Sequence, residues 1–309
     1  MSAAKPLAHV LIIRPGALGD TLMMLPALAD LAPATLVTFL GRRPGIDFLS
    51  GHVDRVMDME GGGWHRLFLE EPGPGPLPAS RADAVVAFLV DDTVRKNLKH
   101  HFPQKPVHLF ETLPEPGEPI HVALHVARKL AQAGLPLDPD RAFRRPAEKG
   151  LLAPRGAGSA TRGGPLVLHP GSGSRQKNFP WSFWRSLLSG ILGCPETRNR
   201  PVALVLGPAE EELLGPVQET SLGDSIRVLL RPGPEDLSRV LQDASLFVGH
   251  DSGVTHLAAL HGTPTLALFR ASDPVQWRPL GPRVRVLQKA GPSADFVAQA
   301  LDAAVSLLG

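Results

Sequence analysis

Short apolar runs alternate with stretches of helical spacing along almost the whole chain. In the first half this pattern predicts strands at 9–13, 36–40 and 84–90 and helices at 21–31 and 120–133. In the second half it predicts strands at 166–169, 202–206, 246–248 and 265–269, and helices at 181–192, 236–244, 254–260 and 294–308. Two segments rich in proline and glycine, 71–78 and 113–119, are predicted loops. This alternation is typical of parallel sheets covered by helices.

The pattern is interrupted between residues 144 and 164, where the chain is rich in glycine, alanine and arginine and has no clear period. At about 150 residues per domain, 309 residues suggest two domains with a linker in this stretch. We therefore predict an α/β fold of two doubly wound, Rossmann-like domains, residues 1–150 and 151–309, that face each other across a cleft.

Charge and cysteine content argue against several classes of protein. Residues 1–150 hold 17 Lys+Arg and 17 Asp+Glu, and residues 151–309 hold 15 and 13, so neither half is a polycation that would bind nucleic acid without sequence preference. Cys194 is the single cysteine, which excludes an intrachain disulfide and a cysteine-rich zinc site. The apolar run at 10–13 ends at Arg14, far short of the ~20 residues of a membrane span, and does not resemble a signal peptide. We expect a cytoplasmic protein.

Ligands bind at the carboxyl ends of the strands in open parallel sheets, so we expect the functional residues in the turns that follow strands. The first such turn is 14–21, RPGALGDT. Gly16 and Gly19 allow a sharp turn and a close approach to a ligand, and Asp20 falls where a helix N-cap is expected. Asp20 is therefore either a cap alone or a catalytic carboxylate. The turn lacks both the G-x-G-x-x-G dinucleotide fingerprint and a Walker A lysine.

The second turn is 169–181, HPGSGSRQKNFPW. Its small residues expose backbone N–H groups, the hydroxyls of Ser172 and Ser174 can donate, and Lys177 adds a positive charge before the next helix begins. These features suit a diphosphate. A flexible loop with a solvated lysine is the alternative.

The third turn is 248–257, VGHDSGVTHL. Asp251 or Ser252 can cap the following helix, whose N-terminus is a second anion site. His256 comes one turn after Ser252 on the same helix face and could reach the same ligand, although a lone histidine on an apolar helix is more often a core residue. No group of residues with metal-ligand spacing accompanies the three turns.

Together the three turns resemble glycosyltransferase family 9, the ADP-heptose:lipopolysaccharide heptosyltransferases, which have the GT-B fold. The resemblance rests on GALGDTLMMLPAL at 16–28, HPGSGSRQKNFPWSFW at 169–184 and GHDSGVTHLAALHGTPTLALF at 249–269, which occur in family order. Phe179 departs from the pattern, because tryptophan is common at that position, and the family's N-terminal acceptor-binding arginines have no clear match.

The resemblance implies roles for matched residues. Asp20 matches the family's general base, and the first domain, residues 1–150, is implied to bind the acceptor. The second domain, 151–309, is implied to bind the donor through a set that also includes Glu211 of the G-x-x-x-E turn at 207–211. The donor residues are Ser172, Ser174, Lys177, Glu211, Asp251, Ser252, Gly253 and His256.

The acceptor is assigned to Gly19, beside the base, and to the basic residues Arg95, Lys96 and Lys99 of the first domain. An anionic glycolipid would be attracted to such a stretch. Asp91 and Asp92 stand next to it, so a solvated charged face is the alternative.

The implied activity is inverting transfer of heptose from ADP-heptose to the lipopolysaccharide inner core, either Kdo-lipid A or an already heptosylated core. The resemblance implies no cofactor and no metal, and we expect no nucleic acid and no obligate protein partner. An enzyme that meets a lipid acceptor would work at the cytoplasmic face of the inner membrane. Two alternatives are a GT-B-like sugar-nucleotide epimerase and a non-catalytic sugar-nucleotide-binding protein, for which Asp20 would be dispensable.

Overall fold

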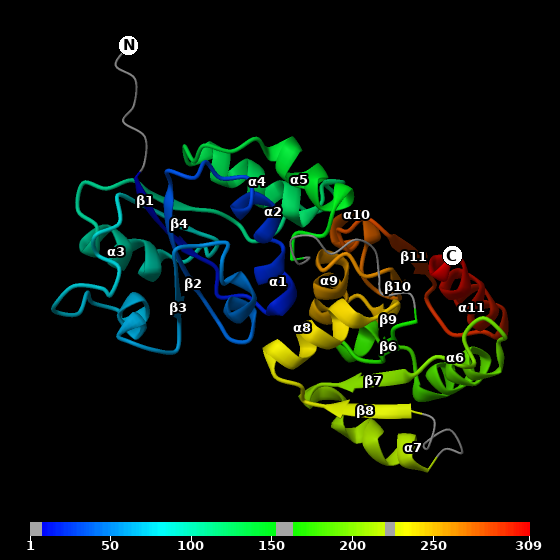
Figure 1. Cartoon of the computed structure of the whole chain (residues 1–309). Coiled ribbons are helices and arrows are strands. Elements are labelled where there is room, and N and C mark those ends of the chain that lie inside the picture. Colours follow the sequence, from blue (N-terminus) through cyan, green and yellow to red (C-terminus); the bar gives the residue numbers. More distant parts are fainter. Residues whose placement is uncertain (1–7, 153–162, 220–225) are drawn as a thin grey trace. The chain divides into compact units, whose positions relative to one another are not determined.

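The computed structural model describes residues 8–152, 163–219 and 226–309 (Figure 1). The chain divides into two compact units between Arg144 and Arg145. The predicted linker begins inside α5 (Pro139–Glu148), so its first residues are helical, and residues 153–162 lie outside the described residues. α5 begins at Pro139 because the carboxylate of Asp138 accepts from the backbone N–H groups of residues 140 and 141.

Unit 1 contains a five-stranded parallel sheet in the order β3-β2-β1-β4-β5. Its strands are β1 (His9–Ile13), β2 (Leu36–Gly41), β3 (Arg55–Asp58), β4 (Ala84–Ala87) and β5 (Val107–Leu109). The chain runs outward from β1 to β3 and then returns to build β4 and β5 on the other side of β1. The loops after β1 and β4 therefore diverge, and the opening between them is where doubly wound sheets bind ligands.

The helices of unit 1 differ from the sequence prediction near the first turn. The predicted helix 21–31 is two short helices, α1 (Leu18–Leu22) and α2 (Leu25–Leu28), because Pro26 has no N–H to continue the first one. The other elements are η1 (Gly45–Leu49), η2 (Trp64–Phe68), α3 (Asp92–His101) and α4 (Val122–Gln132). The predicted strand 84–90 ends early, at Ala87, and the loops at 71–78 and 113–119 contain no helix or strand.

Unit 2 contains a six-stranded parallel sheet in the order β11-β10-β9-β6-β7-β8. Its strands are β6 (Leu166–His169), β7 (Val202–Leu206), β8 (Ile226–Leu230), β9 (Leu246–His250), β10 (Thr265–Phe269) and β11 (Val284–Gln288). Here the order reverses between β6 and β9, so the loops that follow these two strands meet at the switch point. The second and third turns of the sequence are these loops.

The sheet of unit 2 is covered by helices that bury an aromatic cluster. The helices are η3 (Arg175–Lys177), α6 (Trp181–Gly193), η4 (Pro208–Leu213), α7 (Leu214–Gln218), α8 (Pro234–Asp243), α9 (Gly253–Leu260), α10 (Pro274–Trp277) and α11 (Ala294–Leu308). Phe179, Phe183 of α6 and Phe296 of α11 pack ring against ring, with centroids 4.8–5.8 Å apart. This core fixes the end of the second turn to the helix layer.

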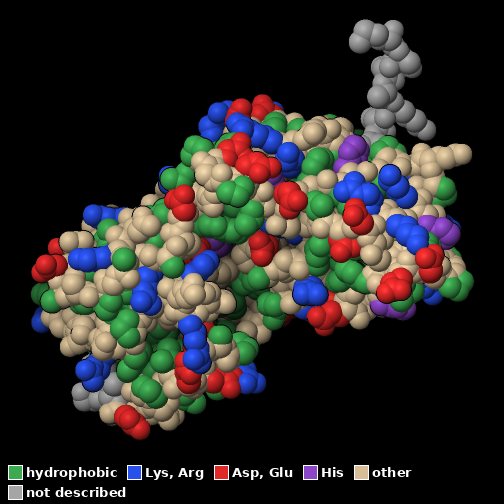
Figure 2. Space-filling view, turned by 180° about the vertical axis from the view of Figure 1, so that it is seen from behind, with side chains coloured by type: hydrophobic (Ala, Val, Ile, Leu, Met, Phe, Trp, Pro, Cys, Tyr) green, Lys and Arg blue, Asp and Glu red, His purple; other side chains and the backbone are tan. Residues whose placement is uncertain are grey.

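Both units are thus parallel α/β sheets, as predicted. On the face shown in Figure 2, lysine and arginine side chains are interspersed with aspartate and glutamate, as the balanced charge count implies. No helix in the described ranges has both the length and the apolar character needed to cross a membrane.

Candidate active site

Asp20 lies in α1, the first helix after β1. The prediction that it is the N-cap is wrong, because the helix begins earlier and Ala17 is the cap residue. Asp20 occupies the third helical position, from which its Oδ2 accepts the Ala17 N–H at 3.1 Å. Gly16 is needed here, since a Cβ at that position would collide with the Asp20 side chain. The carboxylate is 31% exposed, so it remains open to a substrate.

Arg14 holds Asp20 from the buried side. Its guanidinium is 1% exposed and donates to the Asp20 carbonyl at 3.0 Å and to Asp20 Oδ1 at 3.3 Å. Burial lowers the pKa of Arg14, and the charge of Asp20 opposes that shift. The same guanidinium donates to the Thr112 carbonyl at 3.4 Å. Arg14 therefore orients Asp20 and ties it to the loop after β5.

The second turn leaves β6 and folds over the end of the sheet. Ser172 is buried, and its Oγ donates to the Ser174 carbonyl and to Asn178 Oδ1 at 2.8 and 2.6 Å. Its hydroxyl thus braces the loop in this structure. Ser174 is half-buried and forms the residue before η3, with its backbone N–H directed at Ser172 Oγ.

Lys177 and Asp251 meet at the switch point. Lys177 Nζ donates to Asp251 Oδ2 at 2.6 Å, and His256 Nε2 lies 3.5 Å from Asp251 Oδ1. Lys177 is 31% exposed, whereas Asp251 is 3% exposed. Burial raises the pKa of Asp251, but hydrogen bonds from His256 and Lys177 outweigh burial and lower it to about 2. The carboxylate is therefore ionised at neutral pH, and the lysine charge faces the surface.

The third turn caps α9 as predicted. Ser252 is the N-cap, and its Oγ accepts the Thr255 N–H at 3.4 Å. Gly253 is the first helical residue. His256 is almost fully buried, on the face that meets Asp251, so the structure brings the histidine to this cluster. Trp277 of α10 completes the cluster, with its ring centroid 5.8 Å from Lys177 Nζ and 6.4 Å from the His256 ring.

His250, the last residue of β9, anchors the second turn to the third. Its Nε2 accepts the Phe179 N–H at 2.8 Å, and Trp184 packs edge-on against its ring. The pKa of His250 is lowered to about 3. Burial is the largest cause, and the neighbouring His169 is the second. Arg270, the residue after β10, donates to the Asn178 carbonyl at 2.7 Å. The backbone after Lys177 is therefore held by the last residue of β9 and by the first residue after β10.

The two glutamates after β7 point in different directions. Glu210 is buried, accepts the Gly207 N–H at 2.9 Å and fills the space beside Gly171, where a Cβ would collide with it. Glu211 is exposed and pairs with Arg231. Glu211 pairs with Arg231 rather than with the Lys177 cluster, and the donor role of all the predicted donor residues stays a prediction.

The predicted acceptor residues lie in unit 1, and their role also stays a prediction. Gly19 precedes Asp20 in α1. Arg95 pairs with Asp92 at 3.6 Å, Lys96 pairs with Glu71 at 2.9 Å, and Lys99 is exposed near the end of α3.

Sequence reasoning missed several residues that shape the site. The sequence does contain a signal for Arg14. It comes immediately after a buried strand, and a buried cation requires an anionic partner. Trp277 and Arg270 carry no local pattern, since only the folded sheet brings Trp277 to Lys177 and Arg270 to the Asn178 carbonyl.

Acid should destabilise unit 2 because it contains histidines that are buried in the neutral form. Burial lowers the pKa of His261 to about 4 and the pKa of His250 to about 3. The unfolded chain takes up these protons near pH 6.5, so stability is full above that pH and falls as the pH drops toward 4. Each histidine contributes a slope of about 1.4 kcal/mol per pH unit.

Thermal melting at pH 7.5, 6 and 5 measures this effect. We expect the His261→Gln variant to have a shallower dependence, and the control His100→Gln, which changes an exposed histidine, to follow the wild type. Equal melting temperatures at pH 7.5 and 5 would contradict the expectation.

The chain is similar to known proteins in sequence. Residues 81–304 match the family model described as "Glycosyltransferase family 9 (heptosyltransferase)". A curated relative, lipopolysaccharide heptosyltransferase 3 of Escherichia coli, is 33% identical over 95 residues, which are 29% of this chain and 28% of that protein. The chain spans about a third or less of the length of the curated relatives that it matches.

Solved structures share the fold. A glycosyl transferase family 9 protein from Veillonella parvula DSM 2008 has a TM-score of 0.69 at 16% identity, over 98% of this chain and 97% of that one. The E. coli heptosyltransferase WaaC with ADP has a TM-score of 0.66 at 21% identity, over 95% of this chain and 99% of that one. TibC, an iron-containing dodecameric glycosyltransferase from enterotoxigenic E. coli, is less similar, with a TM-score of 0.55 at 14% identity over 91% and 62%. The predicted GT-B fold class is confirmed.

Proposed function

This chain belongs to glycosyltransferase family 9, and from that membership we propose that it transfers heptose from ADP-heptose to the inner core of lipopolysaccharide, on Kdo-lipid A or a heptosylated core. The observation that carries the proposal is the Lys177–Asp251–His256 cluster at the switch point of unit 2. It combines a positive charge for a diphosphate with a buried anion suited to sugar hydroxyls. The relatives named heptosyltransferases support this donor.

The donor diphosphate would bind between Lys177 and the N-terminus of α9. Lys177 supplies a charge-assisted hydrogen bond, and the first N–H groups of α9, at Gly253 and beyond, supply the positive end of a helix dipole. Both stabilise the negative charge that grows on ADP as it leaves. Asp251 limits the motion of Lys177 before the donor arrives, because their ion pair fixes the ammonium group at the mouth of the site.

The acceptor hydroxyl would be activated by Asp20. Its carboxylate takes the hydroxyl proton as the new bond forms between the acceptor oxygen and the anomeric carbon, and the bond from that carbon to the diphosphate oxygen breaks. Attack on the face opposite the leaving group inverts the anomeric configuration, with no covalent enzyme intermediate. Arg14 keeps the carboxylate oriented during the transfer.

The acceptor would be an anionic glycolipid at the cytoplasmic face of the inner membrane. Gly19 is next to the base in α1, and Arg95, Lys96 and Lys99 would attract the negative charge of the acceptor. We propose no obligate protein partner and no nucleic acid.

An assay with ADP-heptose labelled in its sugar tests the function directly. We expect the purified chain to move the label to a lipid A core acceptor and to release ADP. An epimerised nucleotide without glycolipid product would indicate the epimerase instead. Donor binding without turnover would indicate a non-catalytic sugar-nucleotide-binding protein.

We expect transfer to persist in EDTA. Among the described residues, no group of three or more His, Cys, Asp or Glu side chains is arranged to hold a metal ion, and Lys177 with α9 can balance the diphosphate charge. Initial rates before and after dialysis against EDTA check this expectation. Loss of activity that only a divalent ion restores would contradict it, and would bring the chain closer to the iron-containing TibC.

A further inference from the structure

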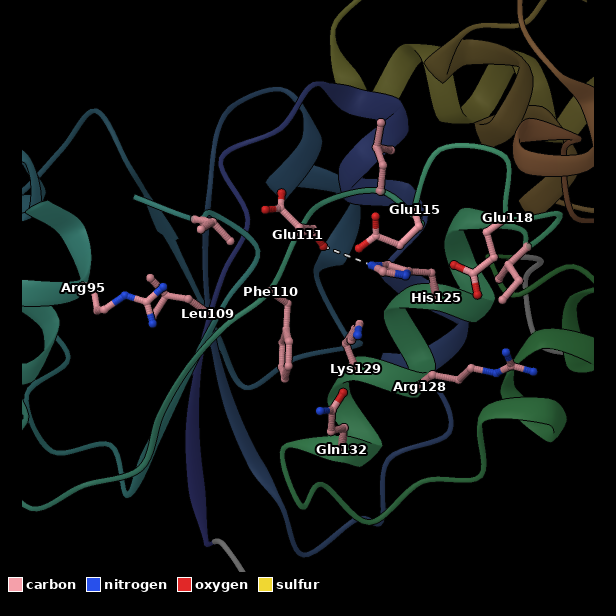
Figure 3. A pocket seen from close by; sticks show the side chains of 13 residues that line it. Arg95, Leu109, Phe110, Glu111, Glu115, Glu118, His125, Arg128, Lys129 and Gln132 are labelled. Carbon is pink, nitrogen blue, oxygen red and sulfur yellow. Dashed lines mark hydrogen bonds between the residues drawn. The ribbon is translucent and has the colours of Figure 1, made fainter. Parts of the chain in front are cut away.

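Unit 1 contains a pocket of about 540 Å³ that no part of the donor cluster uses. It lies beyond the end of β5, between the loop that follows this strand and one face of α4, with Arg95 of α3 at its margin (Figure 3). Four α4 residues at helical spacing line it, namely His125, Arg128, Lys129 and Gln132. His125 closes the inner end, where its Nε2 donates to the Glu111 carbonyl at 3.0 Å.

The pocket brings together charges of both signs that do not neutralise each other. Glu111, Glu115 and Glu118 line it from the loop, and Arg128 and Lys129 line it from α4. In Figure 3 the side chain of Lys129 points toward Phe110, whereas that of Arg128 extends away from it. Across residues 8–152, 163–219 and 226–309, none of these five side chains forms an ion pair. Unpaired carboxylates can accept from hydroxyl groups, and the two cations can bind an acidic substituent.

An aromatic ring completes the lining. Phe110 is half-buried, and its ring centroid lies 5.5 Å from Lys129 Nζ. The ring is backed by Phe88 and His108, with centroids 6.1 Å away in each case. A rigid apolar surface beside carboxylates suits the C–H face of a sugar ring, whose hydroxyls project sideways to polar groups.

The pocket is joined to the proposed base. Thr112 lies between the lining residues Glu111 and Leu113, and its carbonyl accepts from the same Arg14 guanidinium that holds Asp20. One buried side chain therefore connects the pocket loop to the catalytic carboxylate.

We infer that this pocket binds a saccharide that carries an acidic group, as the part of the acceptor adjacent to the sugar that receives the heptose. Arg128 and Lys129 bind the acidic group, the glutamates accept from the hydroxyls, and Phe110 supports the ring. The inference rests on the proposed function. It adds the face of α4 to the acceptor residues proposed above, and Arg95 belongs to both sets.

Acceptor kinetics test the inference. The probe is a water-soluble acceptor, the Kdo-containing core saccharide freed of its acyl chains, and the variant is Arg128→Gln combined with Lys129→Gln. We expect the acceptor KM to rise about tenfold or more, with a larger effect at low salt, because two charge-assisted contacts are lost. The donor KM and kcat should stay within about twofold. Arg55→Gln is the matched control, since Arg55 is exposed on β3 outside the pocket.

Binding of the same saccharide without donor, followed by NMR, separates this inference from the proposed function. Weaker binding to the double variant than to the wild type supports the pocket even if the wild type transfers no heptose, in which case the proposed function fails alone. An unchanged acceptor KM, unchanged binding, or no binding to the wild type would overturn the pocket. Equal binding of a saccharide without the acidic group would also overturn it. Glu115→Gln, which keeps the shape of an exposed side chain, should raise the acceptor KM only a few-fold.

Discussion

Replacing Asp20 with asparagine is expected to slow heptosyl transfer by about two to four orders of magnitude, because an amide cannot take the acceptor proton. The fold should tolerate the change. Asparagine keeps an oxygen that can accept the Ala17 N–H, and Arg14 retains the carbonyls of residues 20 and 112. The buried guanidinium loses its counter-ion, so a decrease in unfolding free energy of about 1–2 kcal/mol is expected.

Three measurements on Asp20→Asn separate chemistry from structure: the melting temperature, the affinity for ADP and the rate of transfer. Asp140→Asn is a matched control, because Asp140 is an exposed aspartate in the first turn of α5. It should transfer at the wild-type rate. If Asp20→Asn remains folded at the assay temperature, binds ADP and transfers within a few-fold of the wild-type rate, Asp20 only stabilises its helix and the mechanism has no base.

The second large effect is expected from Lys177→Met. Methionine keeps most of the apolar stem but removes the charge, and a charge-assisted hydrogen bond to a diphosphate contributes about 1.5–3 kcal/mol. We expect kcat/KM for ADP-heptose to fall by about one to two orders of magnitude. The variant also leaves Asp251, which is 3% exposed, with His256 as its remaining partner, so a lower melting temperature should accompany the kinetic loss.

Arg175→Gln is the control for Lys177→Met. Arg175 belongs to the same turn of η3, is exposed and pairs with Glu212, so its loss removes a positive charge from the loop without touching Asp251. Each variant removes one positive charge from the loop. A larger kinetic loss in Lys177→Met than in Arg175→Gln therefore reports the position of the charge and not the net charge of the loop. A folded Lys177→Met protein with wild-type kinetics would refute the phosphate role.

The sequence by itself determined the α/β class, the central strands and the three turns. The central strands β1, β6, β9 and β10 are buried on both faces, so they read as continuous apolar runs. Four strands were missed, namely β3, β5, β8 and β11. Each lies at a sheet edge and contains an arginine or a histidine that breaks the apolar run. Local pattern also predicted Asp20 as the N-cap of the helix, whereas it is the third residue of α1. The helix begins earlier because the Asp20 carboxylate accepts the backbone N–H of Ala17.

Only the tertiary structure decided which of these residues work together. Lys177 and Asp251 are 74 positions apart and meet because the strand order reverses between β6 and β9, a property of sheet pairing that no local window contains. The same holds for Trp277 beside Lys177 and for Arg14 between Asp20 and Thr112. Periodicity reports which face of an element is buried, whereas the neighbours across a sheet are set by long-range pairing and by the packing of side chains that pairing brings together.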